Sequence, residues 1–379
     1  MGRITDKAKA EEETLSDGQR VRHLSLRHFR NYESLDLEIG DGINLISGKN
    51  AQGKTNLLEA IYLLSSTRLL RGQRDTEAVQ EGFDRAQVSA ELAPLSTLLS
   101  VALERGLRKR VLLNGLALPR ASDVLGRLPC VCVSSADLPL ISGEPADRRL
   151  FLDLELSQLY PAYLRHLAVF KRAVEQRNSL LKLAQTQHVE AELFETWEAQ
   201  MALHGAALRV QRMEFLSNLV PYAQEAQSCI GDGENIELSY LPKDDAVTEE
   251  ELAAAFKDGR RQEIARGSTL IGPHRDDFRV DVAARDARLY ASQGQQRTSM
   301  LSVKLGTMEL ERGERGSAPL LLLDDILSDL DESRRARLMS LIVEHAGQTL
   351  LTCTEPAAAG KEVLRSAQVY RVEAGQVSK

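Results

Sequence analysis

The chain has 379 residues, of which 43% are hydrophobic and 27% charged, as expected for a globular protein of two or three subdomains. Its formal net charge of −7 excludes a generally basic nucleic-acid-binding protein, so any contact with DNA has to come from local basic patches. No apolar run approaches the roughly 18 residues of a membrane helix, and no signal peptide opens the chain, so we expect a cytoplasmic protein that does not enter a membrane.

The first 150 residues predict a β-rich region around one helix. Residues 1–20 are polar and predict a disordered extension or a start that is not native to the protein. An apolar run at Asn56–Leu64 predicts a buried helix. Alternating or apolar segments predict strands at Val21–Leu26, Leu35–Ile39 and Ile43–Ile46 and several more between Val88 and Val133, where Asn114-Gly115 is a hairpin signal.

A helical pattern replaces the strands after Arg148. Apolar residues recur at steps of three and four between Leu156 and Val174, and a second helical stretch covers residues 190–227. The polar residues 185–188 separate the two, which predicts an antiparallel helical arm inserted in the surrounding domain. Thr248 and Glu251 have the spacing of a capping box at the start of one more helix.

An α/β pattern returns from Ser268 onward. Leu320–Leu323 predicts a buried strand before Asp324 and Asp325, and Thr349–Cys353 predicts a last core strand. The four cysteines have no disulfide or metal spacing and are expected to be buried, reduced thiols. We therefore divide the chain into an extension, a first lobe, a helical arm and a second lobe, at residues 1–20, 21–150, 151–255 and 256–379.

A phosphate-binding loop is the most specific motif in the sequence. Its glycines let successive backbone N–H groups face a phosphate, and the following helix adds positive potential there. The lysine is expected to reach the β- and γ-phosphates of ATP, and the threonine is expected to hold Mg²⁺. The pattern GxxxxGK[ST] is matched by Gly48, Lys49, Asn50, Ala51, Gln52, Gly53, Lys54 and Thr55, with Gly48, Gly53, Lys54 and Thr55 at its fixed positions.

Two adjacent carboxylates follow the apolar strand at Leu320–Leu323. Asp324 is placed to meet Mg²⁺ together with Thr55, because a carboxylate at the end of a buried strand can reach the phosphate loop. Asp325 is then placed to polarise an attacking water. We expect Asp325 and Lys54 to be the catalytic residues of an ATPase.

A second candidate phosphate-binding surface is Ala291–Gln296, before an apolar helix. Ser292, Gly294 and Gln295 stand where the LSGGQ signature of ABC ATPases has its serine, second glycine and glutamine, while Gln293 departs from it. In that family the signature contacts the nucleotide of the partner subunit, so the resemblance implies a dimer with two nucleotides between the subunits. Taken alone, the hexapeptide is equally typical of a polar helix cap.

Three further segments resemble the RecF family within the ABC-ATPase and SMC-like heads: Leu24–Ile39, Asp137–Asp153 and Thr269–Phe278. The resemblance covers about residues 21–379. It implies an α/β fold, namely an ABC-ATPase head with a P-loop core and a β-rich lobe, plus an inserted helical arm. It also implies that Arg30 approaches the nucleotide. One departure is the absence of a switch histidine after the last core strand, where Thr352-Cys353-Thr354 stands.

The function implied by this resemblance is recombinational DNA repair. The protein is expected to form a homodimer on binding ATP, to bind double-stranded DNA, and to work with RecO and RecR in placing RecA at gaps. Slow ATP hydrolysis would reset it. Two alternatives remain open from the sequence: the motor subunit of a transporter, and a metabolic P-loop kinase.

Several charged groups permit more than one interpretation. His274 beside Arg275 fits a turn stabiliser better than a metal or catalytic pair, because no other histidine or cysteine has ligand spacing. Clusters of basic residues could contact DNA phosphates or be solvated surface charge. They are Arg68, Arg71 and Arg74; Arg105, Arg108, Lys109 and Arg110; and Arg165, Lys171 and Arg172.

Overall fold

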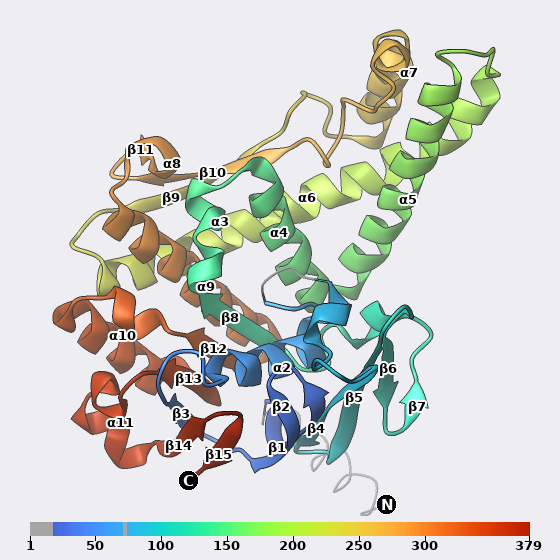
Figure 1. The fold of residues 1–379 in the computed structure, drawn as a ribbon. Helices are drawn as coiled ribbons and strands as arrows, with labels where there is room; N and C mark the ends of the chain where they lie inside the picture. The colour runs from blue at the N-terminus through green and yellow to red at the C-terminus, as the bar shows by residue number, and fades with distance from the viewer. Residues whose placement is uncertain (1–17, 71–73) are drawn as a thin grey trace, which may run out of the picture. The chain divides into compact units, whose positions relative to one another are not determined.

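The computed structural model describes residues 18–70 and 74–379 (Figure 1). Residues 1–17 of the expected extension and Arg71 of the first basic cluster lie outside the described residues. The first strand already begins at Arg20, so the expected extension ends slightly earlier than predicted.

The chain forms two compact units. The head unit comprises Met1–Leu138, Glu225–Gly233 and Met300–Lys379, and the arm unit comprises Pro139–Gln224 and Glu234–Ser299. These boundaries differ from the predicted boundaries at 150/151 and 255/256. The segment from 256 to 299 belongs to the arm unit because its strand β10 (Asp277–Val282) pairs with β9 (Ile236–Leu241) in a small antiparallel sheet.

One sheet of the head unit is antiparallel and has the strand order β2-β1-β4-β5-β6-β7. The hairpin between β6 and β7 turns at Asn114 and Gly115, both with positive φ, as the sequence predicted. Residues alternate between buried and accessible along its strands, so one face lies against the core and the other faces solvent. The strands are β1 Arg20–Phe29, β2 Tyr32–Glu38, β4 Arg85–Ala93, β5 Thr97–Glu104, β6 Arg110–Leu113 and β7 Leu116–Ala117.

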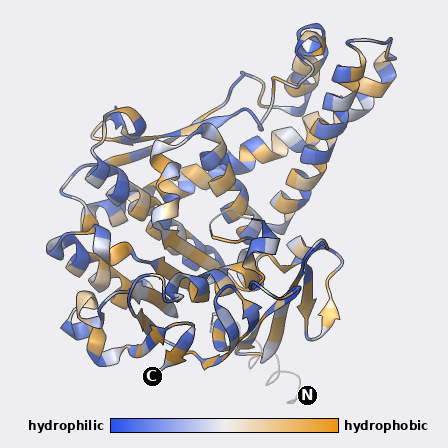
Figure 2. Ribbon diagram, viewed as in Figure 1, coloured by the Kyte–Doolittle hydropathy of each residue, from blue (hydrophilic) through white to orange (hydrophobic). Residues whose placement is uncertain are grey.

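The second sheet of the head unit has the order β15-β14-β3-β13-β12-β8 and is parallel except for β15. Its central strands are almost entirely buried, and Figure 2 colours them as hydrophobic over most of their length. The strands are β3 Ile43–Ser47, β8 Cys130–Ser134, β12 Leu320–Asp324, β13 Thr349–Cys353, β14 Gln368–Glu373 and β15 Gln376–Ser378.

Helix α2 (Lys54–Ser66) packs against strands of both sheets of the head unit. Most of its residues are buried, including Leu57, Leu58, Ile61 and Leu64, as expected for a helix with protein on both sides. In its described residues the unit also contains helices α10 (Glu332–His345) and α11 (Lys361–Ser366), with 3₁₀ turns η1 to η5 at Asp75–Ala78, Ala121–Val124, Ser135–Asp137, Ile326–Asp329 and Pro356–Ala359.

The arm unit contains the predicted antiparallel helices and the small sheet, which β11 (Arg285–Asp286) completes. Its interior includes ion pairs: the guanidinium of Arg177 is fully buried and contacts Glu198 and Glu263. Thr248 caps its helix and pairs with Glu251 as predicted. The helices are α3 Pro139–Ser142, α4 Pro145–Leu159, α5 Pro161–Leu183, α6 Ala191–Ile230, α7 Glu249–Arg266, α8 Ala287–Tyr290 and α9 Gln293–Arg315, and both α6 and α9 continue into the head unit.

Two local predictions were wrong. The helical run from Leu156 to Val174 is broken after Leu159, because Pro161 lacks an N–H donor and starts a new helix instead of continuing the first. Cys229 is exposed on α6, whereas the other three cysteines are buried as expected.

Candidate nucleotide-binding site

The phosphate loop, the two carboxylates and Thr352 come together at one edge of the parallel sheet. Strands β3, β13 and β12 are neighbours in that order, and their carboxyl ends carry Gly48, Thr352 and Asp324 respectively. Open parallel sheets bind ligands at the carboxyl ends of their strands. A cavity of about 310 Å³ lies there, lined by Asn50, Ala51, Gly53, Lys54, Thr55, Asn56, Asp324, Asp325 and Thr352.

Two glycines of the loop have backbone conformations that side chains disfavour. Gly48 has φ +153°, and a Cβ there would lie 2.4 Å from the carbonyl oxygen of Val372. Gly53 has φ +115°, and a Cβ there would lie 2.5 Å from Asn31 and 2.9 Å from the hydroxyl of Tyr32. The glycines therefore serve both the curl of the loop and its close packing.

Lys54 is the first residue of α2, and its side chain bends back over the loop. Its ammonium group donates to the carbonyl oxygens of Gly48 and Lys49, at 2.6 and 2.9 Å. The side chain is only 7% exposed. A buried cation whose partners are neutral carbonyl groups is suited to accepting an anion in the cavity that it lines.

Thr55 and Thr352 hold the carboxylate of Asp324 from two sides. Both threonine hydroxyls donate to the same Oδ1, each at 2.9 Å. Mg²⁺ takes octahedral oxygen ligands at 2.0–2.1 Å, so adjacent ligands lie about 2.9 Å apart. The oxygens of Thr55 and Asp324 already have this separation, and the pair fits the Mg²⁺ site that the sequence predicted.

Asp325 is held in a left-handed backbone conformation, with φ +53° and ψ +27°. Its backbone N–H donates to the hydroxyl of Thr352 at 2.8 Å, and its carbonyl oxygen accepts from Ser328. Thr352 thus connects the backbone of one carboxylate residue with the side chain of the other. The sequence singled out Thr352 only as a departure at the switch-histidine position.

The position next to Thr352 is Cys353, whose side chain is buried between the phosphate loop and the carboxylates. Burial raises the pKa of its thiol to about 11, so the group is a neutral thiol at neutral pH. Thr354 lines a neighbouring cavity of about 370 Å³ with Asp325 and Ser328.

Two residues that the sequence did not single out support the loop from β1 and β2. The amide of Asn31 donates to Gln52 O at 2.9 Å, and the hydroxyl of Tyr32 donates to Gly53 O at 3.0 Å. Burial raises the pKa of Tyr32 above its ordinary value, so the phenol remains a donor. Asn31 and Tyr32 follow Arg30 in the chain, and this turn is the signal that could have identified them.

In the arm unit, the signature residues form the N-terminus of α9. The hydroxyl of Ser292 accepts from the N–H of Gln295 at 3.2 Å, and the side chain of Gln295 accepts from the N–H of Ser292 at 2.8 Å. This reciprocal pair is a capping box. Ser292 is exposed and Gly294 partly so, which leaves the helix end accessible to a further ligand.

Comparisons with known proteins agree with this arrangement. The family model described as RecF/RecN/SMC N terminal domain matches residues 20–378. The chain is 41% identical over 370 residues to the DNA replication and repair protein RecF of Symbiobacterium thermophilum, covering 93% of this chain and 96% of that one. It is 39% identical over 369 residues to RecF of Heliobacterium modesticaldum, covering 95% and 99%. The chain belongs to the RecF family.

Solved RecF structures match the fold closely. The recombination mediator protein RecF-ATPrS in the RecFOR pathway superimposes with a TM-score of 0.87 at 29% identity, covering 96% of this chain and 98% of that one. The corresponding RecF-ATP structure gives 0.86 at 29% identity with the same coverage. An Smc head domain from Pyrococcus furiosus matches with a TM-score of 0.56 at 15% identity, covering 95% of each chain. The predicted ABC-ATPase head fold is therefore confirmed.

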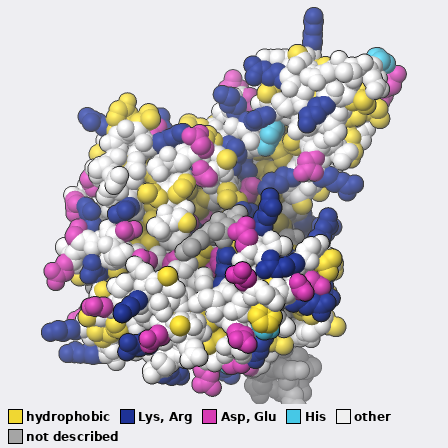
Figure 3. Space-filling model, viewed as in Figure 1, with side chains coloured by type: hydrophobic (Ala, Val, Ile, Leu, Met, Phe, Trp, Pro, Cys, Tyr) yellow, Lys and Arg dark blue, Asp and Glu magenta, His cyan; other side chains and the backbone are white. Residues whose placement is uncertain are grey.

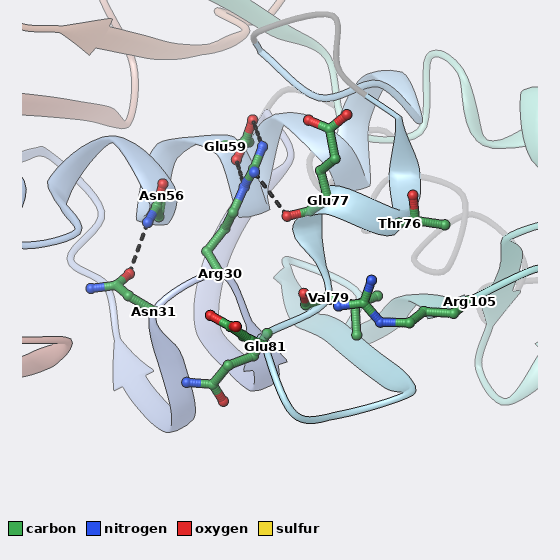
Figure 4. A pocket seen from close by; sticks show the side chains of 10 residues that line it. Arg30, Asn31, Asn56, Glu59, Thr76, Glu77, Val79, Glu81 and Arg105 are labelled. Atoms are coloured by element: carbon green, nitrogen blue, oxygen red, sulfur yellow. Dashed lines mark hydrogen bonds and ion pairs between the residues drawn. The ribbon is translucent and has the colours of Figure 1, made fainter.

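Arg30, predicted from the RecF resemblance to approach the nucleotide, lines a separate cavity of about 580 Å³ (Figure 4). Its guanidinium makes two bonds to Glu59, at 2.7 and 3.0 Å, and a third to the carbonyl of Glu77. Asn56 lines both this cavity and the one at the phosphate loop. Arg30 thus lies beside the phosphate site, and its contact with a nucleotide stays a prediction.

His274 and Arg275 occupy the RecF-like segment of the arm unit as turn stabilisers. Both side chains contact the carbonyl oxygen of Thr269, Arg275 through two donors. Burial lowers the pKa of His274 to about 4, so the imidazole is neutral. Within residues 18–70 and 74–379 no group of three or more histidine, cysteine or acidic side chains has the arrangement of a metal cluster, and no helix there is long and apolar enough to span a bilayer.

Proposed function

We propose that the protein is an ATP-dependent DNA-binding protein of recombinational repair, a dimer when ATP is bound. The main support is that Lys54, Thr55 and Asp324 line one cavity, with 2.9 Å between the hydroxyl oxygen of Thr55 and Oδ1 of Asp324. Its RecF relatives are named for DNA replication and repair, and one RecF structure is named for ATP. Membership of this family decides against a transporter motor or a metabolic kinase.

In this proposal the chain supplies its own half of an ATPase site. The backbone N–H groups from Gly48 to Thr55 and the ammonium of Lys54 bind the phosphates, while Thr55 and Asp324 hold Mg²⁺. Mg²⁺ supplies positive charge that neutralises the phosphate oxygens. Asp325 polarises the attacking water, and its position is fixed by Thr352. Arg30, which lines the adjoining cavity, approaches the nucleotide.

The signature residues act on the nucleotide of a second subunit. Ser292 is exposed and Gly294 partly so, and this end of α9 offers a hydroxyl and backbone N–H groups to an anion. The site of one chain lacks such a second surface unless a partner supplies it, so ATP joins two subunits. Slow hydrolysis separates them. The name of the solved RecF structure refers to the RecFOR pathway, which supports RecO and RecR as partners and RecA loading as the outcome.

DNA binding should then depend on ATP. The net charge of −7 gives a single subunit little long-range attraction for DNA, whereas a dimer brings two sets of basic side chains together. Each added phosphate contact steepens the salt dependence of duplex binding by about 0.9. We would measure duplex affinity over a salt series without nucleotide and with a non-hydrolysable ATP analogue, and follow the size of the protein in both. Equal affinities, slopes and sizes in the two conditions would exclude this function.

A further inference from the structure

A basic groove lies on the solvent face of the antiparallel sheet, on the opposite side from α2. It has a volume of about 630 Å³. Among the described residues that line it, Glu104 alone is acidic, against four arginines. In a chain of net charge −7, and in contrast to the mixture of basic and acidic side chains visible in Figure 3, this is a local excess of positive charge. The lining residues are Arg27, His28, Arg85, Ala86, Gln87, Ala102, Leu103, Glu104, Leu107, Arg108 and Arg110.

Strand register places the floor and sides of this groove. Arg27 is opposite Gln87, Gln87 is opposite Ala102, and Ala102 is opposite Arg110, so the four residues form one row across β1, β4, β5 and β6. The short side chain of Ala102 leaves the middle of the row low. Three strand spacings separate Arg27 from Arg110, or about 14 Å. Arg27 and Arg110 thus lie on opposite sides of a shallow depression.

The basic cluster that the sequence suggested divides into two pairs with different roles. Arg105 donates to the carbonyl oxygens of Phe83 and Val79, and Lys109 contacts Asp75 and donates to Thr67 O. These two side chains are used to hold loops of the head unit.

Arg108 and Arg110 are exposed and line the groove, and no hydrogen bond or ion pair with the described part of the chain engages their side chains. Arg27 and Arg85 have acidic partners, Asp36 at 2.7 Å and Glu104 at 2.9 Å. The side chain of Arg85 is largely exposed, whereas that of Arg27 is half-buried and also donates to the carbonyl oxygens of Leu26 and Leu35. Exposed ion pairs of this kind contribute about 0–1 kcal/mol, so these arginines can exchange a carboxylate for another anion at little cost.

The groove favours the phosphate backbone of a duplex over other anions. Guanidinium groups bind phosphate through two parallel hydrogen bonds, and Gln87 adds an amide donor between them. Single-stranded nucleic acid needs aromatic platforms for its bases. Among the described lining residues His28 is the one aromatic ring, and it is stacked on Phe83 with 3.7 Å between the ring centroids.

We propose that this groove binds the sugar–phosphate backbone of double-stranded DNA, with Arg108 and Arg110 as the principal contacts and Arg27, Arg85 and Gln87 as secondary ones. The proposal deepens the proposed function, on which it rests, by assigning a DNA-contacting surface to the β-rich part of the head unit. The groove is separate from the nucleotide site, since none of its residues lines the cavity at the phosphate loop.

The test is a salt series of duplex affinity for Arg108→Ala/Arg110→Ala, with the ATP analogue present. The loss of two phosphate contacts should lower the salt slope by about 1.8 and weaken binding about thirtyfold at 0.15 M salt. Arg108→Lys/Arg110→Lys keeps the charge and should retain most of the slope. Glu104→Gln should strengthen binding, because it removes the acidic group of the groove and frees Arg85.

The matched control is Arg22→Ala/Arg371→Ala, which removes two exposed arginines of the head unit that do not line the groove. Nucleotide affinity and thermal unfolding should be unchanged in all these variants. Equal losses of DNA affinity in the groove and control variants would overturn the proposal in favour of general charge. A groove variant with the wild-type slope would overturn it and leave the proposed function intact, whereas absence of DNA binding by the wild type would end both. Retained DNA binding with loss of polyglutamate binding would assign the groove to an acidic protein instead.

Discussion

The phosphate loop and the N-terminus of α9 are both proposed to bind an anion through backbone N–H groups, yet they differ in how much of each site one chain supplies. At the phosphate loop, three strands bring a lysine, a threonine and two carboxylates around one cavity, and the hydroxyls of Thr55 and Thr352 fix the carboxylate of Asp324. At α9, Ser292 and Gln295 cap their own helix, Ser292 is exposed, and the amide of Gln295 also donates to Glu234 at 2.8 Å.

In the proposed function, one chain supplies the first site completely, while the second is a surface that acts on the nucleotide of another subunit. Substitutions at the first should act on a single subunit. Substitutions at the second should act only when two subunits meet. The predictions below test this division, beginning with the largest expected effect.

Lys54→Ala should abolish nucleotide binding at practical concentrations. It removes the buried cation of the cavity, and loss of one partner of a buried charged pair costs about 2–5 kcal/mol. A fluorescent ATP analogue titrated into the protein measures the loss. Lys49→Ala is the control, because the side chain of Lys49 is exposed and only its carbonyl group contacts Lys54. Ordinary affinity in Lys54→Ala would remove the phosphate-loop assignment.

Asp325→Asn should keep ATP and Mg²⁺ but lower the hydrolysis rate about 10²- to 10⁴-fold, the range for loss of a general base. The dimer should then persist after ATP is added, which light scattering over time would follow. Asp324→Asn should instead lose Mg²⁺-dependent hydrolysis, because it removes a proposed ligand of the ion. If Asp325→Asn dimers separate as fast as those of the wild type, Asp325 is not the hydrolytic carboxylate.

Ser292→Arg should block ATP-dependent dimerisation while a single subunit binds ATP with wild-type affinity. The bulky cation would fill the accessible end of α9. Monomer binding should be unaffected because Ser292 does not line the cavity at the phosphate loop. Sedimentation with the ATP analogue measures the dimer, and Ser292→Thr, which keeps the capping hydroxyl, is the control. Loss of ATP binding by the monomer would mean that the signature serves its own subunit.

Thr352→Val should reduce hydrolysis about tenfold with little change in ATP affinity. It removes one hydrogen bond to Asp324 and leaves the N–H of Asp325 without its acceptor, a cost of about 1–3 kcal/mol. Thr352→Ser restores the hydroxyl and should restore the rate. The Mg²⁺ concentration for half-maximal rate should rise in the valine variant, a change that a purely structural role would not produce.

A last effect concerns the stability of the arm unit at low pH and leaves nucleotide binding and hydrolysis untouched at neutral pH. His274 has its pKa lowered from 6.5 to about 4, so its neutral form is favoured in the folded state. This contribution is fully present above pH 6.5 and is lost as the pH falls toward 4, to a limit of about 3 kcal/mol. Thermal unfolding of the wild type and His274→Gln between pH 4 and pH 7 measures it. Parallel curves for the two proteins would contradict the assigned pKa.

Local patterns were sufficient for most elements and for the motif residues. The segments at Ile43–Ile46, Asn56–Leu64 and Leu320–Leu323 are strands or helices where predicted, because an element that is buried on all sides leaves a mainly apolar segment in the sequence. The pattern GxxxxGK[ST] identified the loop because its glycines are required by backbone geometry. Pro161 signals a break between two helices, but the helical periodicity of the apolar residues on both sides of it suggested one continuous helix.

The sequence by itself therefore determined the phosphate loop, the acidic strand end, the helical arm and the family. Tertiary structure alone decided the position of Thr352, because strand order places β13 between β3 and β12 although it follows both in the chain. It also separated Arg108 and Arg110 from Arg105 and Lys109, which are neighbours in sequence but have different partners. Strand order and side-chain partners depend on contacts between residues far apart in the chain, and local composition does not record them.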